Sequence, residues 1–184
     1  MERIRSRERA LDEYLVASAR LGDRNAYALL VRGWQPRLVA HAWRLLGDAE
    51  MARESVQEAW AEIVRGLPRL ADAGAFPAWA YRIVSRRCGR AIAAAQHRRR
   101  LGQAVAAEPR EELSESGIAG TDAERLRVAI AGLPPDQRAA IALFYLEEMS
   151  VAEVAVALDV PAGTVKTRLM HARRKLRAAL EGDG

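Results

Sequence analysis

Cationic and hydroxyl side chains are concentrated in one short segment near the C-terminal end of the chain. Residues 160–180 contain Arg, Lys, Thr and His but no Asp or Glu. Side chains of these kinds contact DNA phosphates through their charge and base edges through directional hydrogen bonds. We therefore predict a DNA-contacting face on a helix in this segment. Its outward positions are Thr164, Lys166, Thr167, Arg168, Met170, His171, Arg173, Arg174, Lys175 and Arg177.

The lack of acidic residues distinguishes this segment from most surface helices. A solvated helix usually mixes charges of both signs, whereas a helix that faces phosphate does not. The pattern alone still leaves open an ordinary helical hairpin with a solvated basic face.

The residues before this face predict how it is held. Ser150 followed by Glu153 fits a capping box at the start of a short helix. Val154 and Leu158 continue its apolar stripe, and Pro161 fits the start of a second helix, where a missing amide proton costs nothing. Two short helices around a tight corner predict a helix-turn-helix whose second helix carries the basic face.

A second basic stripe occurs earlier in the chain. Arg82, Arg86 and Arg90 are four residues apart in a predicted helix over residues 77–96, so they project from one side of it. Such a stripe is either a track for a nucleic-acid backbone or a solvated face. Trp79 lies beside it, and a tryptophan there is more often part of the core than a stacking platform for bases.

An acidic and amide-bearing face is predicted on another helix, over residues 49–67. Val56, Trp60 and Ile63 form the apolar stripe of this helix. The opposite face presents Glu54, Gln57 and Glu58. Most faces of this kind only contact water, so periodicity by itself assigns them no partner.

Catalytic and metal-binding constellations are missing from the sequence. His41, His97 and His171 lie in unrelated segments without ligand spacing, and Cys88 is the single cysteine. There is no phosphate-binding glycine loop of the Walker type. We therefore expect neither an enzyme nor a protein with a cofactor or a bound metal.

Composition and periodicity predict an all-α fold of two small helical domains joined by a flexible linker. The chain has 184 residues, aromatic residues make up 5%, and no alternating β-branched run suggests a strand. Helices are also expected over residues 23–48, with a kink or break at Pro36, and over residues 136–148. The predicted units are a helical extension (1–20), a first domain (21–98), the linker (99–121) and a second domain (122–184).

The beginning of the chain and its net charge indicate its surroundings. The first residues are strongly charged, and no apolar run reaches the roughly 18 residues of a membrane-spanning helix. We expect a cytoplasmic protein without membrane insertion. A formal net charge of +5 is consistent with binding to nucleic acid.

These segments resemble the extracytoplasmic-function sigma factors of the sigma-70 family. Residues 133–180 are similar to region 4, the promoter-reading domain, and GTVKTRLMHARRKL is close to its recognition-helix signature. Residues 21–38, 49–70 and 75–90 are similar to region 2. The resemblance identifies the first predicted domain as region 2 and the second as region 4.

The resemblance implies a division of labour on bacterial core RNA polymerase. Region 2 docks on the β′ clamp helices through Glu54, Gln57 and Glu58 and captures the minus-10 element with Trp79, Arg82, Arg86 and Arg90. Region 4 sits on the β flap and reads minus-35 promoter DNA with seven residues of the basic face: Thr164, Lys166, Thr167, Met170, His171, Arg173 and Arg174. The family often has Asn and Asp in place of Arg86 and Arg90, and arginine offers charge and stacking instead of their directional hydrogen bonds.

The predicted two-domain organisation indicates regulation by another protein and leaves two alternative functions open. Because no third domain for sensing a signal is evident, an anti-sigma factor or another external regulator is the expected partner. The chief alternative is a stand-alone helix-turn-helix regulator, a class that usually dimerises on a two-fold operator. A helical adaptor with no role at DNA is the second alternative.

Overall fold

The computed structural model describes residues 2–100 and 122–181, and within these ranges every regular element is a helix. The prediction of an all-α fold is therefore confirmed. None of these helices combines the length and apolarity needed to cross a lipid bilayer. In chain order the elements are α1 (Glu2–Arg20), α2 (Arg24–Leu46), α3 (Ala49–Gly66), η1 (Leu67–Arg69), η2 (Ala73–Ala75), α4 (Phe76–Arg100), α5 (Asp122–Ala131), α6 (Pro135–Ile141), η3 (Ala142–Leu146), α7 (Val151–Leu158) and α8 (Ala162–Glu181).

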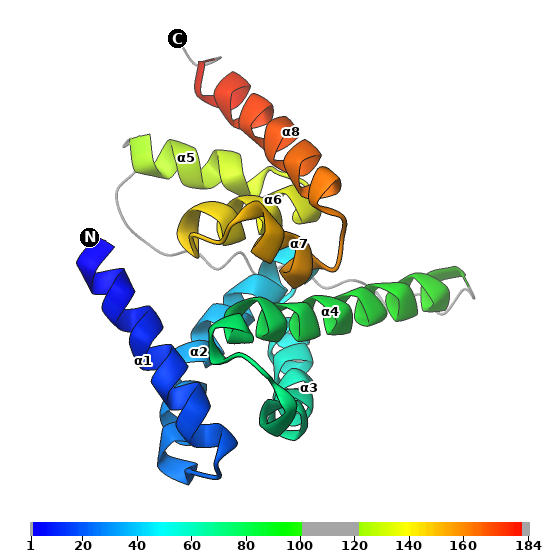
Figure 1. Ribbon diagram of the computed structural model, residues 1–184. Helices are drawn as coiled ribbons and strands as arrows, with labels where there is room; N and C mark the ends of the chain where they lie inside the picture. Colours follow the sequence, from blue (N-terminus) through cyan, green and yellow to red (C-terminus); the bar gives the residue numbers. More distant parts are fainter. Residues whose placement is uncertain (1, 101–121, 182–184) are drawn as a thin grey trace.

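The first half of the molecule is built around an aromatic cluster between α2 and α4. Trp34 is 1% exposed, and its ring meets Phe76 at 5.2 Å and Tyr81 at 5.7 Å, both edge to face. This is the geometry that aromatic pairs favour because of their ring quadrupoles. α3 completes the core, and α1 lies along α2 (Figure 1).

A polar cap begins α2, a glycine ends it, and the helix continues through its proline. The carboxylate of Asp23 accepts hydrogen bonds from the amides of Asn25 and Ala26, and Gly47 closes the helix with φ +68°. Of the kink or break expected at Pro36, the break is absent, since α2 runs without interruption to Leu46. Trp34 and Leu38 on either side of the proline are fully packed, and this burial offsets the lost backbone hydrogen bond.

The second half contains the predicted helix-turn-helix in α7 and α8. The capping box is confirmed: the Ser150 hydroxyl accepts from the Glu153 amide, and the Glu153 carboxylate accepts from the Ser150 amide. Asp159 forms the corner with φ +55°. α8 buries Val165 and Leu169 against the other helices of this half.

The prediction of a single helix over residues 136–148 is wrong in its second part. α6 ends at Ile141, and a π turn, η3, occupies Ala142–Leu146. Glu148 then adopts φ +52°, a left-handed backbone conformation that residues other than glycine rarely adopt. The widened turn leaves Tyr145 on the surface while Leu143 remains fully buried. π turns of this kind are frequent at functional sites.

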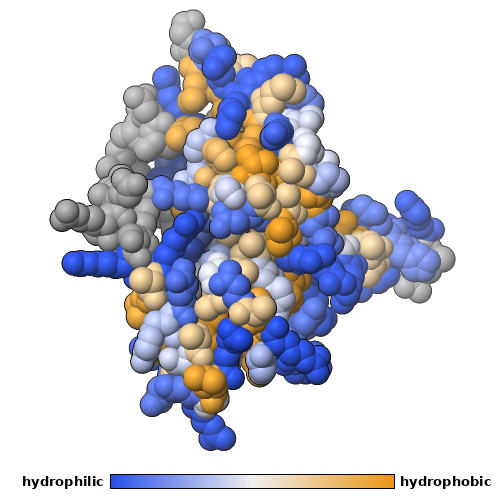
Figure 2. Space-filling model, viewed as in Figure 1, coloured by the Kyte–Doolittle hydropathy of each residue, from blue (hydrophilic) through white to orange (hydrophobic). Residues whose placement is uncertain are grey.

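The two halves pack against each other. α7 lies on α4, and α6 lies on α2, so that the buried residues of both halves form one continuous apolar core (Figure 1). α4 continues to Arg100, which includes the first two residues of the predicted linker. The rest of that linker, residues 101–121, is outside the described residues. The far end of α4 projects from the body and is covered by hydrophilic residues (Figure 2).

A buried histidine lies within this shared core. His41 is 0% exposed, its Nε2 is 2.9 Å from the hydroxyl of Ser85, and its ring meets Tyr81 at 5.0 Å. Burial, helped by the nearby charge of Arg44, lowers the pKa of His41 to about 3. The imidazole is therefore neutral in the folded protein at every pH at which the ordinary histidine titrates.

This burial predicts a loss of stability in mild acid. Below the ordinary pKa of 6.5 the unfolded chain binds a proton at His41 that the folded chain does not bind. The free energy of unfolding should therefore fall by about 1.4 kcal/mol per pH unit as the pH drops from about 6.5 to 5. Guanidinium unfolding at pH 7, 6 and 5 measures this change, and His41→Gln should have the flatter profile. Identical pH profiles of unfolding for the wild-type protein and His41→Gln would contradict the conclusion that the buried His41 stays neutral.

Candidate nucleic-acid interface

The basic face predicted near the C-terminal end lies on the outer side of α8. Lys166, Thr167, Met170, Arg173 and Arg174 are exposed. Thr164 and His171 are half-buried. Val165, Leu169 and Ala172 are buried on the inner side of the helix, so the predicted side chains lie on its outward half. Three of these side chains, Thr164, Thr167 and His171, line an open groove of about 630 Å³ between α6 and the first turns of α8.

Two aromatic rings hold Arg173 in place, and helical periodicity does not predict this contact. Its Nε donates to the Tyr145 hydroxyl at 2.9 Å, and its guanidinium lies 5.6 Å and 5.7 Å from the ring centres of Tyr145 and Phe144. A cation over a ring face is attracted by the ring quadrupole. Both rings belong to the π turn η3, so residues outside α8 help to orient the basic face of α8.

Not every cation of α8 is available to a ligand. The guanidinium of Arg168 lies 3.1 Å from the carboxylate of Asp136 and ties α8 to the start of α6. This ion pair fixes the angle between the two helices at the groove. Arg168 therefore holds α8 in position and is not free to bind a ligand in this arrangement.

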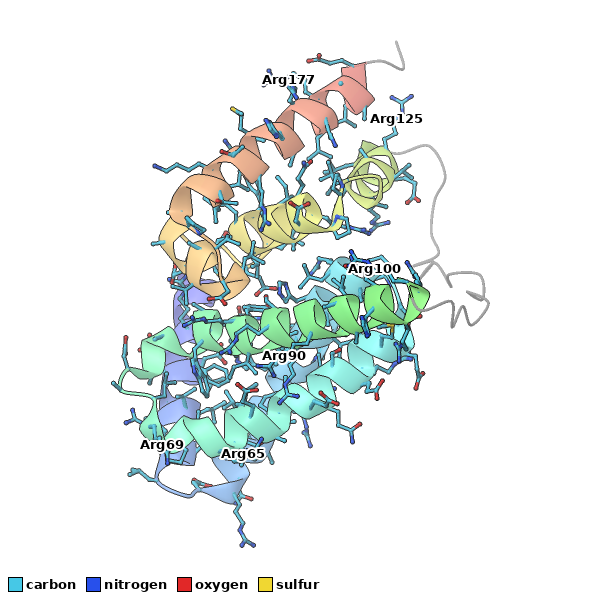
Figure 3. All side chains as sticks on the ribbon, turned by 90° about the vertical axis from the view of Figure 1, so that its right-hand side faces the viewer. Arg65, Arg69, Arg90, Arg100, Arg125 and Arg177 are labelled. Atoms are coloured by element: carbon cyan, nitrogen blue, oxygen red, sulfur yellow. The ribbon has the colours of Figure 1, made fainter. Side chains whose placement is uncertain are left out.

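The arginine stripe on α4 is divided by its contacts. Arg82 forms an ion pair with Asp159, at the corner between α7 and α8, with an N–O distance of 2.8 Å. Arg86 and Arg90 are exposed and have no ion-pair partner within the described parts of the chain. Arg90 is labelled on α4 in Figure 3. Only two of the three predicted side chains are therefore open to a ligand in this arrangement.

Trp79 is mainly a packing residue in this structure. It is half-buried, and its ring lies 6.1 Å from that of Phe76. A side-chain carbon added at Gly66 would lie only 2.7 Å from Cζ2 of Trp79. The end of α3 therefore accepts the indole only because residue 66 has no side chain.

The acidic face on α3 is organised by an arginine from α4. Glu54 and Gln57 are exposed as predicted. Arg87 reaches Glu58 at 2.8 Å and Glu62 at 3.1 Å, so it bridges two carboxylates one helical turn apart. The sequence did not reveal this role of Arg87. It lies 25 or more residues from Glu58 and Glu62 in the chain, and it is not part of the predicted stripe of Arg82, Arg86 and Arg90.

A charged network, also missed by the sequence, joins α1, α2 and the end of η3. The guanidinium of Arg37 lies 4.0 Å from the ring centre of Trp34 and donates from Nε to Glu147 at 2.9 Å. The carboxylate of Asp12 is 3.6 Å from the same guanidinium. Burial raises the pKa of Asp12, while Arg37 opposes that change. These residues hold the two halves of the molecule together beside a small cavity of about 80 Å³.

The contact between Gly66 and Trp79 predicts a specific intolerance. Gly66→Ala should force the indole to move and should lower the free energy of unfolding by about 1–3 kcal/mol. Gly33→Ala is the matched control, because a side-chain carbon there meets nothing within 4 Å on an exposed turn of α2. Chemical denaturation of the two variants separates them; equal stability would show that Trp79 is not fixed by this contact.

Comparison with known proteins assigns both halves to one family. Residues 30–99 match the family model described as "Sigma-70 region 2", and residues 123–176 match "Sigma-70, region 4". The "RNA polymerase sigma-H factor" of Pseudomonas aeruginosa is 30% identical, with 92% of this chain and 94% of the relative covered. The "ECF RNA polymerase sigma-E factor" of Escherichia coli K12 is 31% identical over the same shares of the two chains.

Two solved structures have the same fold. A sigma factor RpoE from Bartonella quintana, in complex with the anti-sigma factor NepR, has a TM-score of 0.65 at 22% identity, and the match covers 86% of this chain and 98% of RpoE. CnrH, in complex with the cytosolic domain of CnrY, has a TM-score of 0.61 at 23% identity and covers 95% and 99%.

Proposed function

The chain belongs to the extracytoplasmic-function sigma factors of the sigma-70 family, and from this membership we propose how its surfaces divide the work of promoter recognition. Sigma factors of this type bind core RNA polymerase, direct the initiation of transcription and carry out no catalysis of their own. Since both regions match, a stand-alone regulator or a helical adaptor no longer accounts for the whole chain.

α8 is proposed to read the minus-35 element from the major groove. The observation that carries this proposal is its exposed basic face, which faces away from the buried side of a helix-turn-helix and lacks any carboxylate over residues 160–180. Lys166, Arg173 and Arg174 would bind phosphates or guanine edges, and the remaining residues would approach base edges and the backbone. These are Thr164, Thr167, Met170 and His171.

α4 is proposed to hold the minus-10 element. Arg86 and Arg90 are exposed and unpaired, so they can contact the opened strand through phosphate and stacking. Arg82 would join them only after leaving Asp159. Trp79 would contribute mainly by supporting the start of this helix.

The acidic face of α3 is proposed to contact the β′ clamp helices, and region 4 the β flap. Glu54 and Gln57 are exposed, and Arg87 fixes the carboxylate of Glu58 without covering it, since its side chain is 56% exposed. A preorganised carboxylate loses less conformational entropy when it binds a cationic partner.

Run-off transcription tests this assignment. Core polymerase should initiate at specific sites on templates from the native genome only when the chain is present. Gln57→Ala combined with Glu58→Ala should lower the affinity for core polymerase at least tenfold while leaving the unfolding midpoint nearly unchanged. Initiation that is identical with and without the chain would refute the function, and unaltered assembly of the double variant would refute the clamp contact.

The packed arrangement is proposed to be a resting state. α7 lies on α4, and the ion pair between Arg82 and Asp159 joins the proposed minus-10 helix to the corner of the proposed minus-35 reader. Two promoter elements cannot be gripped at a distance while these surfaces touch. An anti-sigma factor is the proposed partner that would favour this state. That such a partner exists is supported by the RpoE structure, which was solved in complex with the anti-sigma factor NepR.

Breaking the ion pair should loosen the resting state without adding strain. Asn tolerates the left-handed conformation of residue 159 as well as Asp does, so Asp159→Asn removes only the charge. Affinity of the free chain for single-stranded minus-10 DNA should rise by up to about fivefold, because an exposed ion pair contributes about 0–1 kcal/mol. Asp136→Asn, which breaks a comparable pair within the second half, is the control. Equal effects of the two substitutions would contradict the proposal.

A further inference from the structure

The π turn η3 places a tyrosine against the side of α8. Tyr145 is 50% exposed, whereas Leu143 in the same turn is fully buried. The rings of Phe144 and Tyr145 meet edge to face at 4.9 Å, which is the arrangement that aromatic pairs favour. Leu143 anchors the turn in the core, so the tyrosine is not needed for that purpose.

The hydroxyl of Tyr145 fixes the direction of one guanidinium. Nε of Arg173 donates to this hydroxyl at 2.9 Å, and the guanidinium lies 5.6 Å from the ring centre of Tyr145 and 5.7 Å from that of Phe144. A long side chain on a protein surface ordinarily occupies many rotamers. Because these contacts restrict Arg173, it has less conformational entropy to lose when it binds a ligand.

The contacts leave the outer donors of both side chains available. A guanidinium has five N–H donors, and the bond to Tyr145 uses the one on Nε. The hydroxyl accepts that bond, so its own proton remains available for donation. In the part of the chain that the structure describes, no carboxylate forms an ion pair with Arg173. Arg173 and Tyr145 can therefore donate together to one anion.

Stabilisation of the fold does not account for this contact. α8 is already held by the burial of Val165, Leu169 and Ala172, and the ion pair between Arg168 and Asp136 ties it to α6. Polar contacts between exposed side chains contribute little to the free energy of unfolding, because water competes for the same groups. An exposed arginine with a fixed direction is better explained by a ligand.

The position of Arg173 on α8 favours a backbone phosphate over a base edge as that ligand. The N-terminal residues of a recognition helix reach the base edges, and Arg173 lies about 14 Å further along the helix than Thr164. It is also rotated by about 100° around the helix from Arg174, on the side that faces η3. At such an edge a side chain meets the wall of the major groove, which is made of phosphates.

We infer that Tyr145 is a positioning residue for DNA binding, which holds Arg173 in the direction in which its guanidinium binds one backbone phosphate of the minus-35 duplex. The inference rests on the proposed function, because α8 must first lie in the major groove. Hydrogen bonds from a guanidinium to a phosphate are charge-assisted and depend on direction, so a fixed guanidinium binds more tightly than a mobile one. The π turn thereby contributes to the DNA-binding surface from outside the helix-turn-helix.

Removal of the hydroxyl alone tests the inference on the assembled holoenzyme. The probe is a duplex fragment that carries a promoter mapped by run-off transcription. Tyr145→Phe should lower the affinity for this fragment about threefold to tenfold, which is the range expected for one hydrogen bond. The slope of log affinity against log KCl concentration should stay unchanged, since no charge is lost. Arg173→Gln should make the slope shallower by about 0.9, because it removes one phosphate contact.

Double variants separate positioning from a general effect on the fold. Tyr145→Phe should have no further effect when it is added to Arg173→Gln, whereas it should keep its full effect when it is added to Arg174→Gln. Arg173→Lys keeps the charge but lacks the planar fork, so it should also be insensitive to Tyr145→Phe.

Tyr14→Phe, which removes an exposed hydroxyl from α1, is the matched control and should keep the wild-type affinity. An undiminished loss in the Arg173→Gln background, an equal loss in the control, or a marked fall in the unfolding midpoint of Tyr145→Phe would each overturn the inference.

Neutral backbone substitutions locate the phosphate. A methylphosphonate at one position of the minus-35 duplex should weaken binding of the wild-type holoenzyme severalfold and should not affect Arg173→Gln. Wild type and Tyr145→Phe should rank base-pair substitutions in this element alike, and a changed ranking would overturn the phosphate contact in favour of base readout. Failure of the proposed function looks different, because the wild-type chain would then give no promoter-dependent initiation at all.

Discussion

The packing of α4 against both halves of the molecule is the constraint on which the rest of the structure depends. The helix carries many arginines and no carboxylate, so by itself it would repel its own side chains. Its apolar side is buried against α2 and α3, and α7 rests on it from the other half. Glu58, Glu62 and Asp159 come from those neighbours and supply the negative charge that α4 lacks.

These partners decide which cations are structural and which are available. Arg87 orders the acidic face of α3, Arg168 fixes α8 on α6, and Arg37 joins α1 and α2 to the end of η3. Arg86 and Arg90, by contrast, have no such partner in the described chain and face outward. A count of basic residues would treat all of them alike, although a paired guanidinium must break its ion pair before it can bind phosphate.

Stability and DNA binding make opposing demands on the same surfaces. The continuous core between the halves favours the compact molecule, because apolar surface there is removed from water. Under the proposed function, gripping two separated promoter elements requires that contact to be given up. Core polymerase would then have to supply more binding free energy than the junction does, and a regulator that stabilises the junction would act against it.

The sequence by itself determined the helical fold, the helix-turn-helix and the outward direction of the basic face. These features are local: the capping box at Ser150, the corner at Asp159 and the apolar spacing of Val165 and Leu169 involve residues within one or two turns. The sequence also marked the α3 face that contains Glu58, but not the arginine that organises it.

Only the tertiary structure decided which charges are paired. Arg82 meets Asp159 across 77 positions, and Arg37 meets Glu147 across 110. Helical periodicity cannot relate residues so far apart, because it describes one helix at a time and contains no information on how helices meet. The unbroken path through Pro36 and the π turn at Ala142–Leu146 follow for the same reason, since burial by other helices outweighed the local preference of the backbone.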